Sequence, residues 1–178
     1  MKLIGLKLSS MMSLRNRRRS GQSLVEFTLM GIPMVFVTIS VVYVSIGMWQ
    51  FYSLAYASDM TARYVSVHGA TCAQNGNTCT ITVGNVATFF ATQAMALDTS
   101  KVIVKMTDGS GTTTCNPVSS CNSTSTAFPN ASYYSVGSDI KITATYGIKS
   151  PLAMFWPPDV DWAHDYTVGA QSRQRIMF

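Results

Sequence analysis

A glycine, an amide and a lone carboxylate lie together at the start of a long apolar stretch. Gly21, Gln22 and Glu26 follow three consecutive arginines at 17–19, and no other charged residue occurs before Asp59. A carboxylate at the edge of a membrane helix is energetically costly, so its presence there indicates a function. Gly21 places a residue without a side chain at the boundary between the basic and the apolar segments, and Glu26 is the single acid at that boundary.

The four cysteines form two closely spaced pairs, Cys72 with Cys79 and Cys115 with Cys121. Each pair flanks a short polar turn, and four cysteines allow three disulfide connectivities. We expect the pairs 72–79 and 115–121, because each closes a local loop. A zinc site is the alternative, but neither pair has the two-residue spacing of common zinc sites. The sequence therefore predicts disulfides and no metal.

Charge and motif content argue against nucleic-acid binding and against enzymatic activity. The chain carries 13 Lys and Arg residues against 8 Asp and Glu residues, but six of the basic residues lie within 1–21. The remainder holds seven basic and eight acidic residues, so the basic balance belongs to the N-terminal segment and not to a folded surface. Only two histidines occur, and no phosphate-binding glycine loop, zinc-protease motif or nucleophile elbow is present. We expect neither catalysis nor a cofactor.

The apolar stretch is long enough to cross a membrane and project from it. Residues 27–58 contain no charge, and as a helix they reach roughly 48 Å at 1.5 Å per residue. A bilayer core is about 30 Å thick. The arginines at 17–19 predict a cytoplasmic N-terminus. Pro33 is expected to kink the helix, because it removes a backbone hydrogen bond and clashes with the preceding turn.

The remaining residues predict one small α+β domain. The long helix is expected to run from Gln22 to near His68, with Asp59 and Arg63 forming an i,i+4 pair. Residues 80–83 suggest a short strand and residues 85–97 a helix. Three further strands follow from alternating apolar residues at 102–106, 140–146 and 166–170. Between the first two of these, residues 108–138 are expected to form a long polar loop.

These elements together predict a long N-terminal transmembrane helix that continues into a small periplasmic domain. That domain is expected to contain one further helix and an antiparallel sheet of about three to four strands. The expected boundaries are a basic leader at 1–21, the transmembrane helix and its extension at 22–57, and the domain at 58–178.

The N-terminal motif resembles the processing site of type IV pilin-like precursors. The stretch from Arg19 to Phe27 reads RSGQSLVEF, and a single apolar span follows it. With a helix ending at Asp98, a strand from Lys101 and a terminal segment at 172–175, the chain is similar to the TadE-like family. These are minor pseudopilins of the tight-adherence, or Flp pilus, system.

The resemblance implies roles for particular residues and partners. In such proteins a prepilin peptidase cuts after the glycine, here Gly21, and the carboxylate five residues on, here Glu26, directs assembly. The implied partners are the membrane, the peptidase, other pilin-like subunits and the pilus assembly platform. The implied location is the bacterial inner membrane, with the C-terminal domain in the periplasm. The cysteine loops and the Ser/Thr-rich insertion depart from the family pattern, so partner identity does not transfer.

A second interpretation belongs to a different class of protein. The chain is then a permanently anchored envelope protein, such as an adhesin or a ligand-binding module, in which the motif at Gly21 is coincidental. The mass of the mature N-terminus distinguishes the two interpretations.

Overall fold

The computed structural model describes the backbone of residues 3–68, 81–130, 132, 136–149 and 165–176. Within these ranges it describes the side chains from Gly21 onward, except those of Lys149 and Asp165. The chain divides into two compact units, Met1–Ser45 and Ile46–Phe178, which we describe separately. Helix α1, Leu3–Val67, contributes to both. Its end near His68 agrees with the sequence prediction, but it begins well before the expected start at Gln22. The added segment is rich in Leu, Lys, Met and Arg, which are favourable helix formers.

In the first unit, α1 carries mostly apolar side chains, and several of its Ser and Thr hydroxyl groups donate hydrogen bonds to carbonyl oxygens of the same helix. Thr28 donates to the carbonyl oxygen of Leu24 at 2.6 Å, and Ser40 donates to that of Phe36 at 2.8 Å. Thr38 and Ser45 donate in the same way to carbonyls four residues back. These bonds spare the hydroxyls the cost of an unpaired polar group in an apolar environment.

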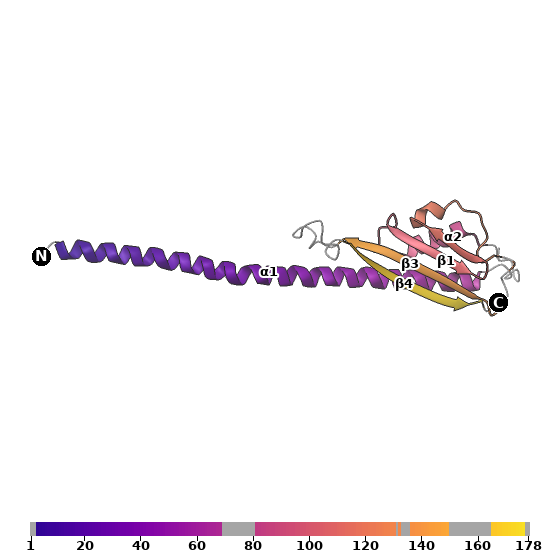
Figure 1. The fold of residues 1–178 in the computed structure, drawn as a ribbon, viewed down its shortest axis with the longest axis horizontal. Coiled ribbons are helices and arrows are strands. Elements are labelled where there is room, and N and C mark those ends of the chain that lie inside the picture. Colours follow the sequence, from indigo (N-terminus) through magenta and orange to yellow (C-terminus); the bar gives the residue numbers. More distant parts are fainter. Residues whose placement is uncertain (1–2, 69–80, 131, 133–135, 150–164, 177–178) are drawn as a thin grey trace. The chain divides into compact units, whose positions relative to one another are not determined.

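The second unit is built around a four-stranded antiparallel sheet in the order β2-β1-β3-β4 (Figure 1). The strands are β1, Val102–Asp108; β2, Gly111–Cys115; β3, Asp139–Lys149; and β4, Asp165–Arg175. Val104, Ala144 and Ala170 lie side by side across three strands. The alternating apolar residues thus predicted β1, β3 and β4 correctly, and the α+β fold with one further helix is confirmed.

One face of this sheet forms the core with the distal part of α1 and with helix α2, Val83–Gln93. The sheet contributes the even-numbered residues of β1 and β3, including Val104, Met106 and Ile142, which are buried. Helix α1 contributes Leu54, Ala57, Ala62 and Val65, and α2 contributes Val86, Ala87 and Phe90. Removal of these side chains from water is the main stabilising contribution to the domain.

The segment before α2 is a helix cap, and the prediction of a strand there is wrong for the described residues 81–83. Thr82 makes only an isolated antiparallel bridge to Ala127. Its hydroxyl accepts a hydrogen bond from the backbone N–H of Asn85 at 3.2 Å, so Thr82 is the N-cap. The helix therefore starts at Val83, two residues before the predicted start.

The same helix ends four residues earlier than predicted. Ala94 leaves the helical conformation with a ψ of 49°, and Leu97 turns back to donate to the carbonyl of Ala94 at 3.1 Å. This turn buries Leu97 and leads the chain into β1. Residues 94–97 have high helix propensity, so tertiary packing outweighs the local preference.

The predicted polar loop at 108–138 also contains regular structure. It includes strand β2, which pairs with β1, and the short 3-10 helix η1, Val118–Cys121. Asp108 organises the β1–β2 turn, because its carboxylate accepts hydrogen bonds from the N–H groups of Ser110, Gly111 and Asn130.

Candidate functional site

The predicted cleavage and assembly residues lie within two turns of α1. The side-chain amide of Gln22 lies 3.5 Å from a carboxylate oxygen of Glu26, at the limit of a hydrogen bond, and both residues are exposed. At Gly21 a Cβ atom would meet nothing within 4 Å. These three residues therefore make few contacts within the described chain, and their substitution leaves the fold unstrained.

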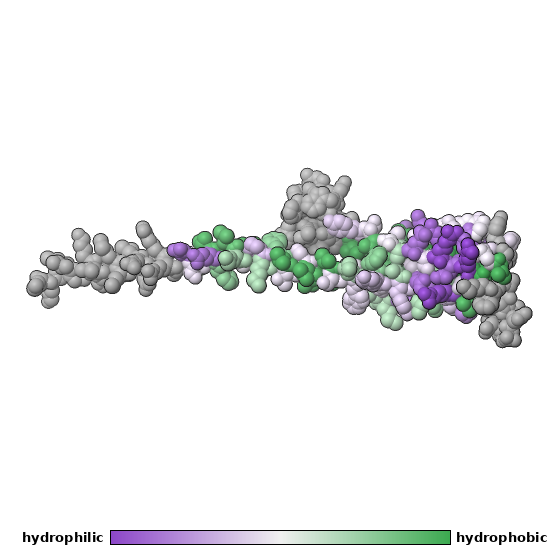
Figure 2. Space-filling model, turned by 90° about the horizontal axis from the view of Figure 1, so that it is seen from below, coloured by the Kyte–Doolittle hydropathy of each residue, from purple (hydrophilic) through white to green (hydrophobic). Residues whose placement is uncertain are grey.

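The helix that follows Glu26 exposes large apolar side chains in all directions. The part of α1 from Gly21 to Val67 is long and apolar enough to cross a membrane, and none of its most apolar window is buried. Figure 2 shows hydrophobic side chains along the described surface of this helix. The most exposed are Phe27, Leu29, Met30, Met34, Val44 and Trp49. Such a surface needs lipid or other helices around it.

Pro33 lies inside α1, and the helical assignment continues on both sides of it. The neighbouring Gly31 has one side-chain atom, Cε1 of Phe27, 4.0 Å from the position of a Cβ. The kink expected at Pro33 stays a prediction.

The predicted disulfide between Cys115 and Cys121 is present. The two Cα atoms are 5.6 Å apart, and both residues are buried. The bond joins the end of β2 to η1 and so fixes the segment that packs against α2. The other expected disulfide, between Cys72 and Cys79, lies outside the described residues. Within the described ranges, no group of three or more His, Cys, Asp or Glu side chains is placed to hold a metal ion.

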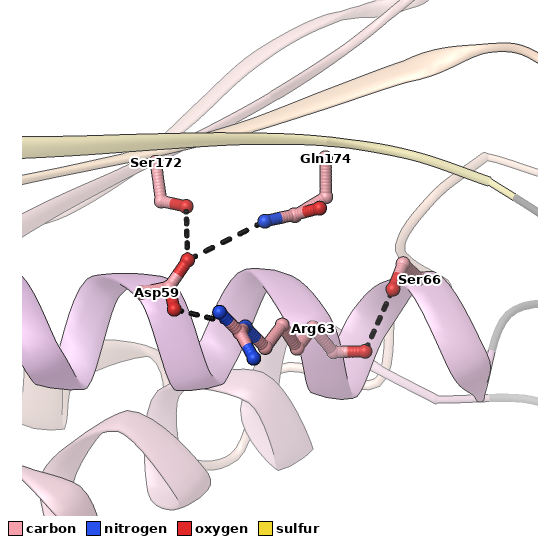
Figure 3. A network of polar contacts seen from close by, with 5 residues as sticks. All are labelled: Asp59, Arg63, Ser66, Ser172 and Gln174. Atoms are coloured by element: carbon pink, nitrogen blue, oxygen red, sulfur yellow. Dashed lines mark hydrogen bonds and ion pairs between the residues drawn. The ribbon is translucent and has the colours of Figure 1, made fainter.

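A polar cluster that the sequence did not reveal joins α1 to β4 (Figure 3). One carboxylate oxygen of Asp59 accepts hydrogen bonds from Ser172 at 3.1 Å and Gln174 at 3.4 Å. The other lies 2.9 Å from the guanidinium of Arg63, which confirms the predicted i,i+4 pair. Ser172 and Gln174 lie on the face of β4 that the register aligns with the buried residues of β3. The cluster therefore anchors the edge strand of the sheet on the long helix.

Aromatic stacking joins α1 to α2 near the end of the long helix. The ring of Tyr64 stacks on Phe89 with centroids 4.3 Å apart and on His68 with centroids 4.4 Å apart. A ring nitrogen of His68 also lies 3.0 Å from the carbonyl oxygen of Tyr64. These contacts assign His68 a packing role.

Comparison with known proteins identifies no relative of this chain. No protein-family model matches the chain, and neither a curated protein nor a solved structure matches it.

Proposed function

We propose that the chain is a membrane-anchored minor pseudopilin that takes part in assembling a tight-adherence pilus or a related secretion apparatus. The observation that carries the proposal is the isolated exposed carboxylate of Glu26 at the start of an exposed apolar helix. It supports an intermolecular role, because among the described residues the only side chain bonded to Glu26 is Gln22.

Lipid and sister helices are the two environments that suit this apolar surface. The arginines at 17–19 favour a cytoplasmic N-terminus, and the domain then lies in the periplasm of a bacterial inner-membrane protein. In this arrangement the protein is a substrate of a prepilin peptidase and not an enzyme.

Assembly through Glu26 follows from the energetics of a charge in lipid. A carboxylate at mid-membrane depth costs about 2.5–3.5 kcal/mol on insertion scales, and less near the interface. That cost is offset when the carboxylate meets the α-amine that cleavage creates at Gln22 of the same or a neighbouring chain. Because one axial stagger brings an amine and a carboxylate of neighbouring helices together, the pair also sets the register between subunits.

The structure allows processing to be tested without a confounding effect on folding. Gly21→Ala should block cleavage by the cognate prepilin peptidase, whereas Gly47→Ala should not. The two glycines are a matched pair, because both lie in α1 and a Cβ at either meets nothing within 4 Å. The mass of the mature N-terminus is the measurement. An uncut wild-type chain, in the presence of active peptidase, supports the permanently anchored alternative instead.

Assembly is tested separately with Glu26→Ala and Glu26→Gln. Both variants should insert in the membrane and be processed after Gly21, yet fail to co-purify with their pilin-like partners. Thr28→Ala, two residues further along α1, is the control and should assemble normally. Wild-type levels of assembly by Glu26→Gln would show that the charge has no role.

A further inference from the structure

The face of the sheet that points away from the distal part of α1 carries a cluster of positive charge that the described acidic side chains offset only in part. Odd-numbered residues of β1, β3 and β4 lie on this outer face, and none of those with described side chains is buried. They include Lys105, Lys141, Arg173 and Arg175, four of the six described cationic side chains in the unit Ile46–Phe178. Figure 2 shows hydrophilic side chains gathered over one part of this domain.

Only one described acidic side chain offsets these four cations. Asp139 forms ion pairs with both Arg173 and Arg175. Lys105 and Lys141 have no ion pair within the described part of the chain, whereas Arg63 and Lys101 elsewhere in the domain each have one. The whole unit contains seven basic and seven acidic residues. Among the described side chains, positive charge is therefore concentrated on this face, whereas the unit as a whole carries no excess of basic residues.

The arrangement of these charges opposes the stability of the sheet. Lys141 lies directly opposite Arg173 in the β3–β4 register, and like charges directly opposite one another are destabilising. Lys105 on β1 is a diagonal neighbour of Lys141, since their respective partners are Thr143 and Thr107. The ion pairs with Asp139 account for the two arginines but not for Lys105 and Lys141, whose charges suit the attraction of an anionic partner.

The other side chains of the outer face indicate which class of anion would bind there. Hydroxyl groups of Thr112, Thr114, Thr143 and Thr145 share the outer face with the lysines, and the described face carries no aromatic side chain. Aromatic platforms are the usual means of stacking nucleic-acid bases. Hydroxyls and cations without aromatics suit carboxylates, which accept hydrogen bonds from both groups.

We propose that the outer face, defined by Lys105, Lys141, Arg173 and Arg175, is a docking surface for an acidic segment of a neighbouring protein. The affinity of this face for clustered carboxylates does not depend on the proposed function. Binding is electrostatic, so it weakens as salt screens the charges.

The test uses the full-length chain in non-ionic detergent and a fluorescein-labelled peptide of ten glutamates. The six basic residues of the segment 1–21 are replaced by Gln, so that this segment does not bind the peptide. Fluorescence anisotropy should show binding at low ionic strength that is largely lost in 0.3 M salt, where the Debye length is about 6 Å. Lys105→Gln with Lys141→Gln should weaken binding at least tenfold. Arg63→Gln with Lys101→Gln removes the same charge from outside the outer face and should change affinity less than twofold.

Two further measurements separate a binding role for the lysines from a role in folding or in helix assembly. The melting temperature of the Lys105→Gln, Lys141→Gln variant should be no lower than that of wild type, since the substitution relieves the repulsion by Arg173. Glu26→Ala should bind the peptide normally, so a failure of the assembly proposal leaves this result intact. The proposal is overturned if no peptide binds at low salt or if both double variants lose affinity equally. It is also overturned if a ten-nucleotide single-stranded DNA, or vesicles containing phosphatidylglycerol, bind more tightly than the peptide.

Discussion

Replacing Asp59 tests whether the polar cluster, and not only the apolar core, holds the sheet on α1. Asp59→Ala removes the acceptor for Ser172 at 3.1 Å and Gln174 at 3.4 Å, together with the ion pair to Arg63. Hydrogen bonds to a charged group contribute about 1.5–3 kcal/mol each. The two here are partly buried and long, so we take about 1 kcal/mol for each. The exposed i,i+4 pair adds about 0.3–0.5 kcal/mol.

The sum predicts a loss of roughly 2–3 kcal/mol in the free energy of unfolding of the domain. For a unit of this size, each kcal/mol lowers the melting temperature by about 2–8 °C. Thermal unfolding of the full chain in detergent, followed by near-ultraviolet circular dichroism, measures the change. Because β4 is the edge strand that loses its anchor, we expect limited proteolysis to cut within β4 before it cuts α1.

Matched variants identify which contact matters. Arg63→Ala removes only the exposed ion pair and should lower the melting temperature far less than Asp59→Ala. Ser172→Ala combined with Gln174→Ala removes only the contacts from β4 and should reproduce most of the effect. The cluster does not anchor the strand if Asp59→Ala melts at the same temperature as wild type. The same holds if Arg63→Ala lowers the melting temperature as much as Asp59→Ala does.

Two other substitutions test the packing of the segment between β2 and β3. Gly84→Ala should destabilise the domain by about 1–3 kcal/mol, because a Cβ there would lie 2.6 Å from the backbone oxygen of Asn122 and 2.9 Å from that of Thr124; a urea midpoint equal to wild type would contradict this. Burial of Asp108 raises the pKa of its carboxyl group, but hydrogen bonds from Ser110, Asn130 and Gly111 outweigh that effect and lower the pKa below its ordinary value. The carboxylate therefore contributes stability that is fully present above about pH 4 and is lost as the pH falls through the lowered pKa. Asp108→Asn should cost roughly 1 kcal/mol at neutral pH, allowing for solvent screening. It should also remove part of the acid sensitivity seen in melting temperatures measured from pH 5 to pH 2.

The sequence predicted correctly those elements whose apolar residues repeat regularly. It failed for elements that have no such repeat or that depend on helix capping. Strands β1, β3 and β4 alternate apolar and polar residues, so their burial follows from period alone. Strand β2 reads Gly-Thr-Thr-Thr-Cys and buries only Cys115, so no periodic signal distinguished it from a loop. The residues at 80–83 alternate like a strand, although Thr82 with Asn85 was also a recognisable capping signal.

The candidate sites show the same division. Gly21, Gln22 and Glu26 lie on one short helical segment, so their proximity follows from the sequence. Asp59 and Gln174 are 115 positions apart, and their contact depends on which face of β4 meets α1. The positive outer face likewise emerges only from the cross-strand register, because Lys141 and Arg173 are distant in the chain.

The alignment of the strands with the long helix determines how the domain responds to force. Strands β3 and β4 are paired along all 11 residues of each and run alongside the part of α1 that packs on them. The hydrogen bonds between antiparallel strands lie perpendicular to the strand direction. A pull along this distal part of α1, resisted by a neighbour held on the sheet, therefore loads this ladder in shear. Bonds loaded in shear share the tension and break together, whereas a pull across the strands would open them one at a time, so the domain is strongest along its own strands.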